Sequence, residues 1–266
     1  MAGSFYPADP DELRSALAAL LGPFSPSDHA LAEKLPRALV VPHAGLDFSG
    51  PVAAAAYARL LPFARRYRRI VLLGTAHGQS FDGLALPGVD AFATPLGTVP
   101  VDAAGVASLD GPQVFVDPDL HRFEHSIEVQ LPFLQVVLDR FRIVPLLVGK
   151  AGADTVARII ESLCETETSL LVVSTDLTHD THQRDARIHD HRTRYAIEAL
   201  DPEHIGASDA CGAVSLRGLL KAAAHRGLEA ETLDMRNSSD TIGSHKHVVG
   251  YGAWMFHGRE TSAQAF

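Results

Sequence analysis

Histidines placed after apolar runs are the first feature of this chain that could do chemistry. Three strongly apolar runs each lead into such residues, which are His43, His77, and the pair Asp176 and His179. If the runs are parallel strands, their carboxyl ends meet at one edge of a sheet, where ligands gather. A lone histidine is usually a capping or solvated loop residue, but three strand ends together predict a site that holds a metal ion or moves a proton.

Cys211 adds a sulfur donor to this set. It lies in the segment 208–212, where Asp209 is expected to cap a helix and to leave Cys211 in the first helical turn. The helix dipole favours thiolate there, and a thiolate can ligate a metal. The alternative is a small buried hydrophobic residue, which is our interpretation of Cys164. Two cysteines cannot form a disulfide framework and fit a reducing compartment.

The elements that must position these residues alternate between strand and helix patterns. Apolar runs predict strands at 38–41, 70–73, 114–116, 143–148, 170–173, 232–235 and 248–255. Periodic apolar residues predict helices that begin after Asp9, at 52–61, 102–109, 124–138, 154–163 and 183–200, and after Asp209. Because the strands lack polar faces, we expect a mostly parallel central sheet covered on both sides by helices, a three-layer α/β/α fold.

Composition limits the classes of function. The 266 residues are 46% hydrophobic and 21% charged, which fits one large core and a single domain over residues 1–266. No run approaches the roughly 20 apolar residues that span a bilayer, and the N-terminus lacks a signal-peptide pattern. We therefore expect a cytoplasmic protein without a membrane partner. The net charge of −9 and the scattered basic residues argue against a nucleic-acid partner.

One competing motif has to be weighed. The segment His121–His125 matches the H-x-x-E-H pattern of inverted zinc peptidases, which need both histidines on one helical face. Asp117-Pro118-Asp119 precedes it as a loop, and no long helix clearly contains the motif, so the peptidase interpretation is disfavoured. The sequence has no G-x-S-x-G elbow, no P-loop and no G-x-G-x-x-G.

Several motifs together resemble the Memo family, whose bacterial members are also called the B protein of the AmmeMemoRadiSam system. In chain order they are Ala2-Gly3-Ser4-Phe5-Tyr6-Pro7, Pro42-His43-Ala44-Gly45, Gly74-Thr75-Ala76-His77, Glu124-His125-Ser126-Ile127-Glu128, Ser174-Thr175-Asp176 with His179, and Cys211-Gly212. The resemblance spans residues 2–256. It implies a fold similar to that of the class III extradiol dioxygenases, which use non-haem iron.

The resemblance also implies roles for single residues. His43 and His77 are the implied histidine ligands, and Cys211 is the implied third ligand, where the dioxygenases have a carboxylate. His179 is the implied acid/base residue, and Asp176 lines the same pocket. The implied cofactor is one transition metal ion, with Fe(II) expected first. Thiolate softens the site, so copper and zinc are alternatives.

A wider group of residues is expected around the ligands. Glu124, His125 and Glu128 could donate or accept hydrogen bonds that fix the imidazole tautomers, with a solvated helix position as the alternative for Glu128. Tyr6 could donate into the pocket or pack in the core. Departures from the family pattern, at Leu46, Gly78 and residues 213–215, leave the proposed ligands intact and the substrate open.

Three functions remain compatible with the sequence. The first is a metal-dependent redox enzyme in which His179 moves a proton. The second is a non-catalytic module that uses the same cleft to bind a peptide or to hold a metal, and the third is a zinc-dependent hydrolase with Asp176 as base. Expected partners are a small molecule or a peptide. The resemblance adds a radical-SAM enzyme and an AMMECR1-like protein of the same system.

Overall fold

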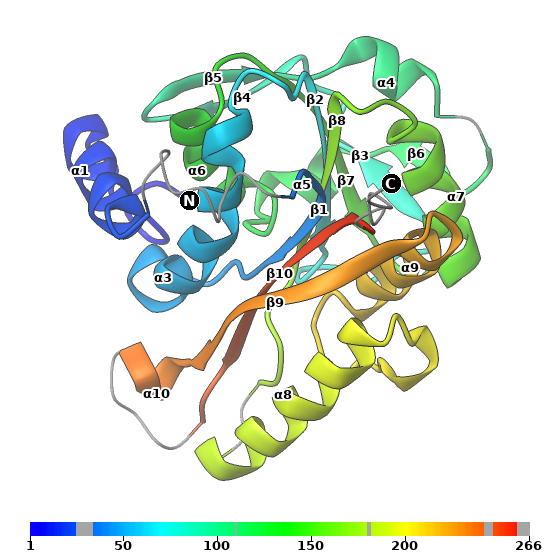
Figure 1. Cartoon of the computed structure of the whole chain (residues 1–266). Coiled ribbons are helices and arrows are strands. Elements are labelled where there is room, and N and C mark those ends of the chain that lie inside the picture. The colour runs from blue at the N-terminus through cyan, green and yellow to red at the C-terminus, as the bar shows by residue number, and fades with distance from the viewer. Residues whose placement is uncertain (25–33, 110, 180–181, 242–246, 260–266) are drawn as a thin grey trace, which may run out of the picture.

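A mixed sheet forms the centre of the computed structural model, which describes residues 1–24, 34–109, 111–179, 182–241 and 247–259. In the described part of the chain the strand order of this sheet is β6-β3-β7-β2-β8-β1-β10-β9 (Figure 1). The strands are β1 (Pro36–Val41), β2 (Arg69–Thr75), β3 (Leu84–Leu86), β6 (Val114–Val116), β7 (Arg142–Val148), β8 (Ser169–Ser174), β9 (Leu228–Asn237) and β10 (Gly250–Gly258). A separate hairpin pairs β4 (Ala91–Thr94) with β5 (Gly97–Pro100).

The middle of the sheet is parallel. β7, β2, β8 and β1 run in one direction. At one edge β10 is antiparallel to β1 and β9 is antiparallel to β10, and on the other side β3 is antiparallel to β7. β8 is buried at every residue, and β2 and β7 at every residue after the first, as expected for strands covered on both faces. The carboxyl ends of β1, β2 and β8 therefore lie side by side, with Val41 paired to Ser174 and Leu73 to Val173.

Two helical layers cover this sheet, as predicted. α1 (Pro10–Leu21), α3 (Leu46–Tyr57) and α6 (Leu131–Val137) lie on one face, and α7 (Ala153–Leu163), α8 (Gln183–Glu198) and α9 (Ala213–His225) on the other (Figure 1). Alternate residues of each strand point to opposite layers: Leu39 and Val41 pack with the first group, and Ala38 and Val40 with the second. The chain is thus α/β with a three-layer arrangement.

The shorter elements complete the connections between the layers. They are η1 (Ala58–Phe63), α4 (Ala103–Ala107), α5 (Pro118–Arg122), η2 (Glu128–Gln130), η3 (Pro202–His204) and α10 (Ser238–Thr241). The first helix begins as its sequence predicts, because Asp9 accepts hydrogen bonds from Asp11 N at 2.9 Å and Glu12 N at 3.0 Å. In α3 the small side chains of the buried alanines 53–56 let the helix pack closely on β10.

Two predicted helix starts are wrong. The helix expected over 124–138, with Pro132 expected to kink it or to limit its start, begins at Leu131, and Pro132 lies in its first turn. The Glu124 carboxylate accepts the amides of His77, His125 and Ser126 and keeps the start of this stretch out of the helix. Asp209 does not cap α9. Its Oδ2 accepts from Gly206 N at 2.6 Å, and Gly212 is the N-cap, so Cys211 precedes the helix instead of lying in its first turn.

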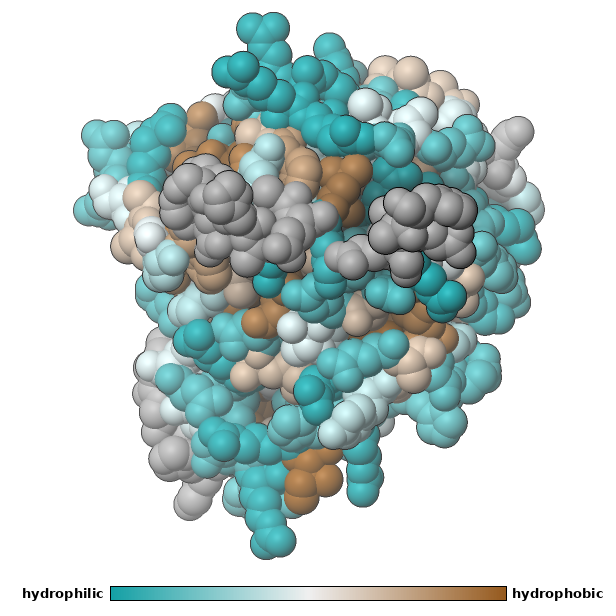
Figure 2. Space-filling model, in the orientation of Figure 1, coloured by the Kyte–Doolittle hydropathy of each residue, from teal (hydrophilic) through white to brown (hydrophobic). Residues whose placement is uncertain are grey.

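The face of the molecule shown in Figure 2 is mostly hydrophilic, with hydrophobic residues in small separate patches. Every helix among the described residues is too short or too polar to span a membrane.

Candidate metal centre

The three predicted strand ends converge at one edge of the sheet. His43, His77 and Asp176 each lie two residues beyond the last residue of β1, β2 and β8 respectively. The rings of His43 and His77 meet edge to face with their centroids 5.0 Å apart. Asp176 joins them through its Oδ1, which accepts a hydrogen bond from the His43 amide at 2.8 Å. The parallel order of these strands is what brings the residues together.

His43 is fixed in one tautomer by a buried polar network. Its Nδ1 lies 3.0 Å from Ser174 Oγ, and Gln130 Nε2 donates to the same oxygen at 2.8 Å. A hydroxyl has one hydrogen, and Ser174 donates its own to the Ser126 carbonyl at 2.6 Å. Nδ1 of His43 must therefore carry the proton that it shares with Ser174. Nε2 is left to face Cys211. Burial lowers the pKa of this imidazole, but the charges of Asp176 and Cys211 outweigh burial and raise it.

His77 is oriented by Glu124 in the same manner. Glu124 Oε1 lies 3.0 Å from His77 Nδ1, and Oε2 accepts the His77 amide at 2.7 Å. Burial raises the pKa of Glu124, but the hydrogen bonds from His77 and Ser126 outweigh burial and lower it to about 2. A carboxylate can only accept, so Nδ1 of His77 carries a proton as well. Both imidazoles thus keep Nε2 for a ligand.

Cys211 lies beside the two histidines. Its Sγ lies 3.4 Å from His43 Nε2 and accepts the Asp176 amide at 3.3 Å. Burial raises the pKa of this thiol, but the facing imidazoles of His43 and His77 lower it to about 5. His77 shows the opposite shift, because its hydrogen bonds to Cys211 and then to Glu124 raise its pKa to about 10. The two histidines therefore stabilise the thiolate form of Cys211.

Gly212 allows Cys211 to approach this closely. A Cβ added at Gly212 would lie 2.8 Å from Thr175 Cβ, so a larger residue cannot fit without displacing the loop. Thr175 Oγ1 accepts the Gly212 amide at 2.8 Å and donates to the Asp176 carbonyl at 2.8 Å. The turn that carries Cys211 is thus tied directly to the end of β8.

His125 is a third histidine in the cluster, with a closer role than the sequence predicted. Ligand atoms of His43, His77 and His125 all lie within 4.8 Å of one another, so these three residues can hold a metal ion. The His125 ring stacks on His77 at 4.7 Å and on Phe5 at 4.3 Å. Burial and then the charge of His43 lower the pKa of His125 to about 4, which keeps it neutral at pH 7.

The other predicted site residues lie around this group at different distances. Tyr6 is buried and donates to Glu128 Oε1 at 2.6 Å, so these two side chains bind each other. His179 is exposed, its Nδ1 lies 2.9 Å from the Leu177 carbonyl, and it lines a second cavity with Asp185 and Arg192. The motif His121–His125 is no helical face: α5 ends at Arg122, and His121 Nε2 lies 2.8 Å from the Ala85 carbonyl.

The loop beyond Asp176 is fastened to the antiparallel edge of the sheet. Leu177 N donates to the Gly250 carbonyl at 2.8 Å, and Gly250 N donates to the Thr178 carbonyl at 2.8 Å. Gly250 is the first residue of β10, which also pairs with β1. One strand therefore supports both the strand of His43 and the loop that follows Asp176.

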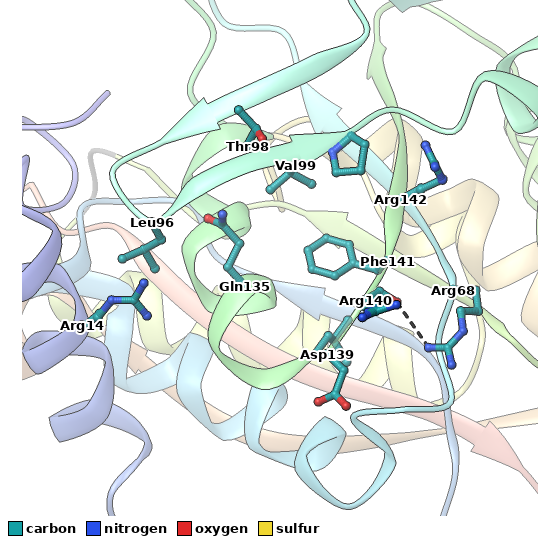
Figure 3. A pocket seen from close by; sticks show the side chains of 12 residues that line it. Arg14, Arg68, Leu96, Thr98, Val99, Gln135, Asp139, Arg140, Phe141 and Arg142 are labelled. Carbon is teal, nitrogen blue, oxygen red and sulfur yellow. Dashed lines mark hydrogen bonds between the residues drawn. The ribbon is translucent and has the colours of Figure 1, made fainter.

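Two cavities differ in their relation to the donors. A cavity of about 270 Å³ opens directly onto His77 and Cys211. A larger cavity of about 580 Å³ lies at the amino ends of β2 and β7, where Arg14, Arg68 and Arg142 line it around Phe141 (Figure 3). That end of the strands is opposite the one that carries the histidines. The smaller cavity is therefore the one that serves the cluster.

Sequence reasoning missed three supporting residues. Ser174 lies in a motif that carries the family resemblance, but no pattern assigned it to His43. Gln130 gave no signal, because it lies within a stretch predicted to be helical. Phe5 also lies in a motif of the resemblance, and only the fold shows that it covers His125. The donor set itself, with imidazoles and a thiolate whose protonation is fixed by neighbours, fits a transition metal.

Comparisons with known proteins agree with the motifs. The family model described as Memo-like protein matches residues 1–255. A MEMO1 family protein of Methanopyrus kandleri is 34% identical, covering 96% of this chain and 97% of its own. One of Methanosarcina barkeri is 35% identical, covering 95% and 97%.

A solved structure shares the fold at low sequence identity. An uncharacterised protein of Escherichia coli K12 aligns with a TM-score of 0.54 and 16% identity, covering 80% of this chain and 98% of its own. The family model and the relatives extend over almost the whole chain, and the span matched by the family model, residues 1–255, contains the cluster. The chain therefore belongs to the Memo family.

Proposed function

We propose that this protein binds one transition metal ion through His43, His77 and Cys211 and uses it in a redox reaction. The observation that supports this most is that Cys211 Sγ lies 3.4 Å from His43 Nε2 and also bonds to the His77 side chain, with the Nδ1 atoms of both rings tied to oxygens. Two imidazoles and a thiolate leave coordination positions open, and the soft sulfur suits Fe(II), Cu(I) and Zn²⁺. Fe(II) is our first choice of metal, because it supplies electron transfer to O2 or to a bound substrate.

The residues of the chain would orient the donors and move protons. Ser174 and Glu124 hold the two rings in the tautomer that exposes Nε2. His125 is neutral at pH 7 and stacks directly on His77, but its pKa of about 4 makes it a weak base, so it would take part through hydrogen bonds beside the donors. We retain Asp176 and His179 as the candidates for proton transfer. Asp176 is the nearer, because it bonds to the His43 backbone.

Metal content in matched variants tests the proposed ligands. Wild-type protein is purified without oxygen, and bound Fe, Cu and Zn are quantified per chain. We expect about one metal ion in the wild type and its loss in His43→Ala and Cys211→Ala. Cys164→Ala is the matched control, because Cys164 is buried elsewhere in the fold and should leave the metal in place. Unchanged metal content in both ligand variants would contradict the proposal.

A zinc-dependent hydrolase is the second candidate, and one observation favours it. His43, His77 and His125 form a three-histidine group, which is a ligand set that holds Zn²⁺ with one position open for water. Asp176 would then be the base. This candidate predicts that His125→Ala loses the metal while Cys211→Ala keeps it. It also predicts zinc as the native metal and hydrolysis of 4-nitrophenyl acetate without consumption of O2.

The non-catalytic alternative would use the same metal ligands as the redox enzyme but would catalyse no reaction. We propose a small molecule or a peptide as the partner of the cleft, with a radical-SAM enzyme and an AMMECR1-like protein as further partners. An enzyme should consume O2 or change a substrate when it is loaded with metal, and should slow in His125→Ala or His179→Ala. Metal-loaded protein that does neither, with both variants unchanged, would support a binding module.

A further inference from the structure

A cavity beside the donors has a chemical character that selects its ligand. Three segments border its volume of about 270 Å³: the loop after β2, the end of β7 and the start of α9. Among the described residues that line it there is no aspartate and no glutamate. Apart from His77 and Cys211, its one ionisable side chain is Lys150. The cavity therefore favours a negatively charged ligand.

Lys150 is held in place but has no charged partner. Its amide donates to the Phe81 carbonyl at 2.7 Å, and its carbonyl accepts from Gly83 N at 2.9 Å. The backbone of Asp82 forms a bridge with Lys150, yet no ion pair of the Lys150 side chain occurs among the described residues. The exposed Lys150 side chain lines the cavity and can pair with an anion.

The start of α9 offers hydrogen-bond donors to this cavity. Ser215 lines the cavity, and its hydroxyl makes no hydrogen bond to any described residue, so it can donate to a ligand oxygen. Ser215 lies in the first turn of α9, which contains no acidic residue, and its amide and that of Val214 lack helical acceptors. This end of α9 is therefore suited to an oxygen acceptor.

The lining of the cavity is partly apolar. Thr75, Gln79 and Ser80 add polar groups to it, but Phe81, Val148 and Val214 give it an apolar part. A fully hydrated inorganic ion would not bury these side chains, whereas a ligand with an apolar body would. The volume limits that body to a small molecule.

We propose that this cavity is the substrate pocket and that it takes a small organic anion with an apolar body. The carboxylate or phosphate of the ligand pairs with Lys150, and an oxygen at its other end accepts a hydrogen bond from Ser215. This inference rests on the proposed function, because it places the ligand against His77 and Cys211. Benzoate and phenyl phosphate are suitable probes for the two kinds of anion, and benzamide is the neutral counterpart of benzoate.

Protection of Cys211 from iodoacetamide tests the pocket in metal-free protein. The cavity opens onto Cys211, so a bound ligand should block its alkylation, which peptide mass mapping distinguishes from that of Cys164. We expect saturating benzoate or phenyl phosphate to slow alkylation at least five-fold, and benzamide to have little effect. Protection by only one of the two anions would assign the ligand to that class. Equal protection by benzoate and benzamide, or none by either anion, would overturn the proposal.

Charge variants separate the pocket from a general effect of charge. Lys150→Met should abolish protection by the anions, Lys150→Arg should keep it, and Ser215→Ala should weaken it. Lys221→Met is the control, because it removes one charge from α9, where Lys221 pairs with Asp154 at 2.7 Å outside the cavity. Anion protection that survives in Lys150→Met would overturn the proposal.

The measurement remains informative if the proposed metal function fails. Absence of metal from wild-type protein would contradict the redox proposal but would not alter alkylation of metal-free Cys211. Protection that still depends on Lys150 would then support the anion pocket by itself. Normal metal content with no anion protection would leave the metal proposal standing and refute the pocket.

Discussion

Replacing Ser174 with alanine should weaken metal binding without removing a ligand. Ser174 Oγ is the acceptor for His43 Nδ1–H and for Gln130 Nε2, and it donates to the Ser126 carbonyl. In Ser174→Ala the His43 ring loses the bond that aims Nε2 at Cys211. Loss of such a partner of a ligating histidine typically costs about 10–100-fold in metal affinity. That range corresponds to about 1.4–2.7 kcal/mol of binding free energy.

The same change should also destabilise the metal-free protein. Gln130 keeps its bond to the Pro42 carbonyl at 2.9 Å, but the His43 Nδ1–H and the Ser126 carbonyl are left buried without a partner. We expect the free energy of unfolding to fall by about 1–3 kcal/mol. Unfolding in urea measures this loss, so it can be separated from the loss of metal affinity.

Competition with a chromogenic chelator for Zn²⁺ gives the metal affinity of each variant. Ser169→Ala is the matched control, because Ser169 is buried at the opposite end of the same strand, β8, and its hydroxyl contacts Thr166. This control should lose stability but not affinity. If Ser174→Ala binds Zn²⁺ as tightly as Ser169→Ala does, Ser174 does not orient His43 for the metal.

Three further changes probe other parts of the structure. In metal-free protein, iodoacetamide should label Cys211 at pH 7, and labelling should fall as the pH drops through about 5, the pKa of its thiol. Mass spectrometry should show no labelling of Cys164, because burial raises the pKa of that thiol to about 12. Equal labelling of the two cysteines would contradict the lowered pKa of Cys211. Gly212→Ala should displace Cys211, because the new Cβ would lie 2.8 Å from Thr175 Cβ, and it should therefore lower zinc affinity in the chelator assay. Gly152→Ala is the control, because its Cβ meets nothing within 4 Å and should leave the affinity unchanged. Equal zinc affinities of the two variants would refute the crowding at Gly212. Burial raises the pKa of Asp102, but the hydrogen bond from Arg69 at 2.6 Å outweighs burial and lowers it. The ion pair therefore stabilises the folded protein above the unfolded pKa of about 4, and this stabilisation is lost as the pH falls through the lower pKa of the folded state. Asp102→Asn should therefore cost about 1 kcal/mol in urea unfolding at pH 7 and less near pH 3, and a constant cost would show that the ion pair is not responsible.

The fold was largely predictable because its central strands are short and wholly apolar. Such runs are buried on both faces, and they fixed both the layer order and the edge at which His43 and His77 meet. The helix predicted over 124–138 failed for a tertiary reason. Its apolar spacing is genuine, but Glu124 binds three backbone amides across the loop, and spacing cannot reveal such bonds.

The convergence of His43, His77 and Asp176 was predictable from the strand ends, but the electrostatics around Cys211 were not. Cys211 was expected to be a thiolate because of a helix dipole, yet it precedes α9, and its pKa is lowered by His43 and His77. No local pattern could show this, because these three residues are far apart in the chain. The closeness of His125 was equally hidden, since it depends on how the loop after α5 folds back over β2.

The attachment of β10 to both β1 and the loop after β8 has a consequence for biosynthesis. β10 is the last strand of the sheet in the described part of the chain, so the ribosome has made His43, His77, His125 and Cys211 before it makes this strand. Until β10 emerges, β1 lacks one neighbour and the loop after β8 lacks its anchor at Gly250. The imidazoles and the thiol therefore reach their final geometry only after β10 has been made, and a metal ion held there as proposed would bind after that point.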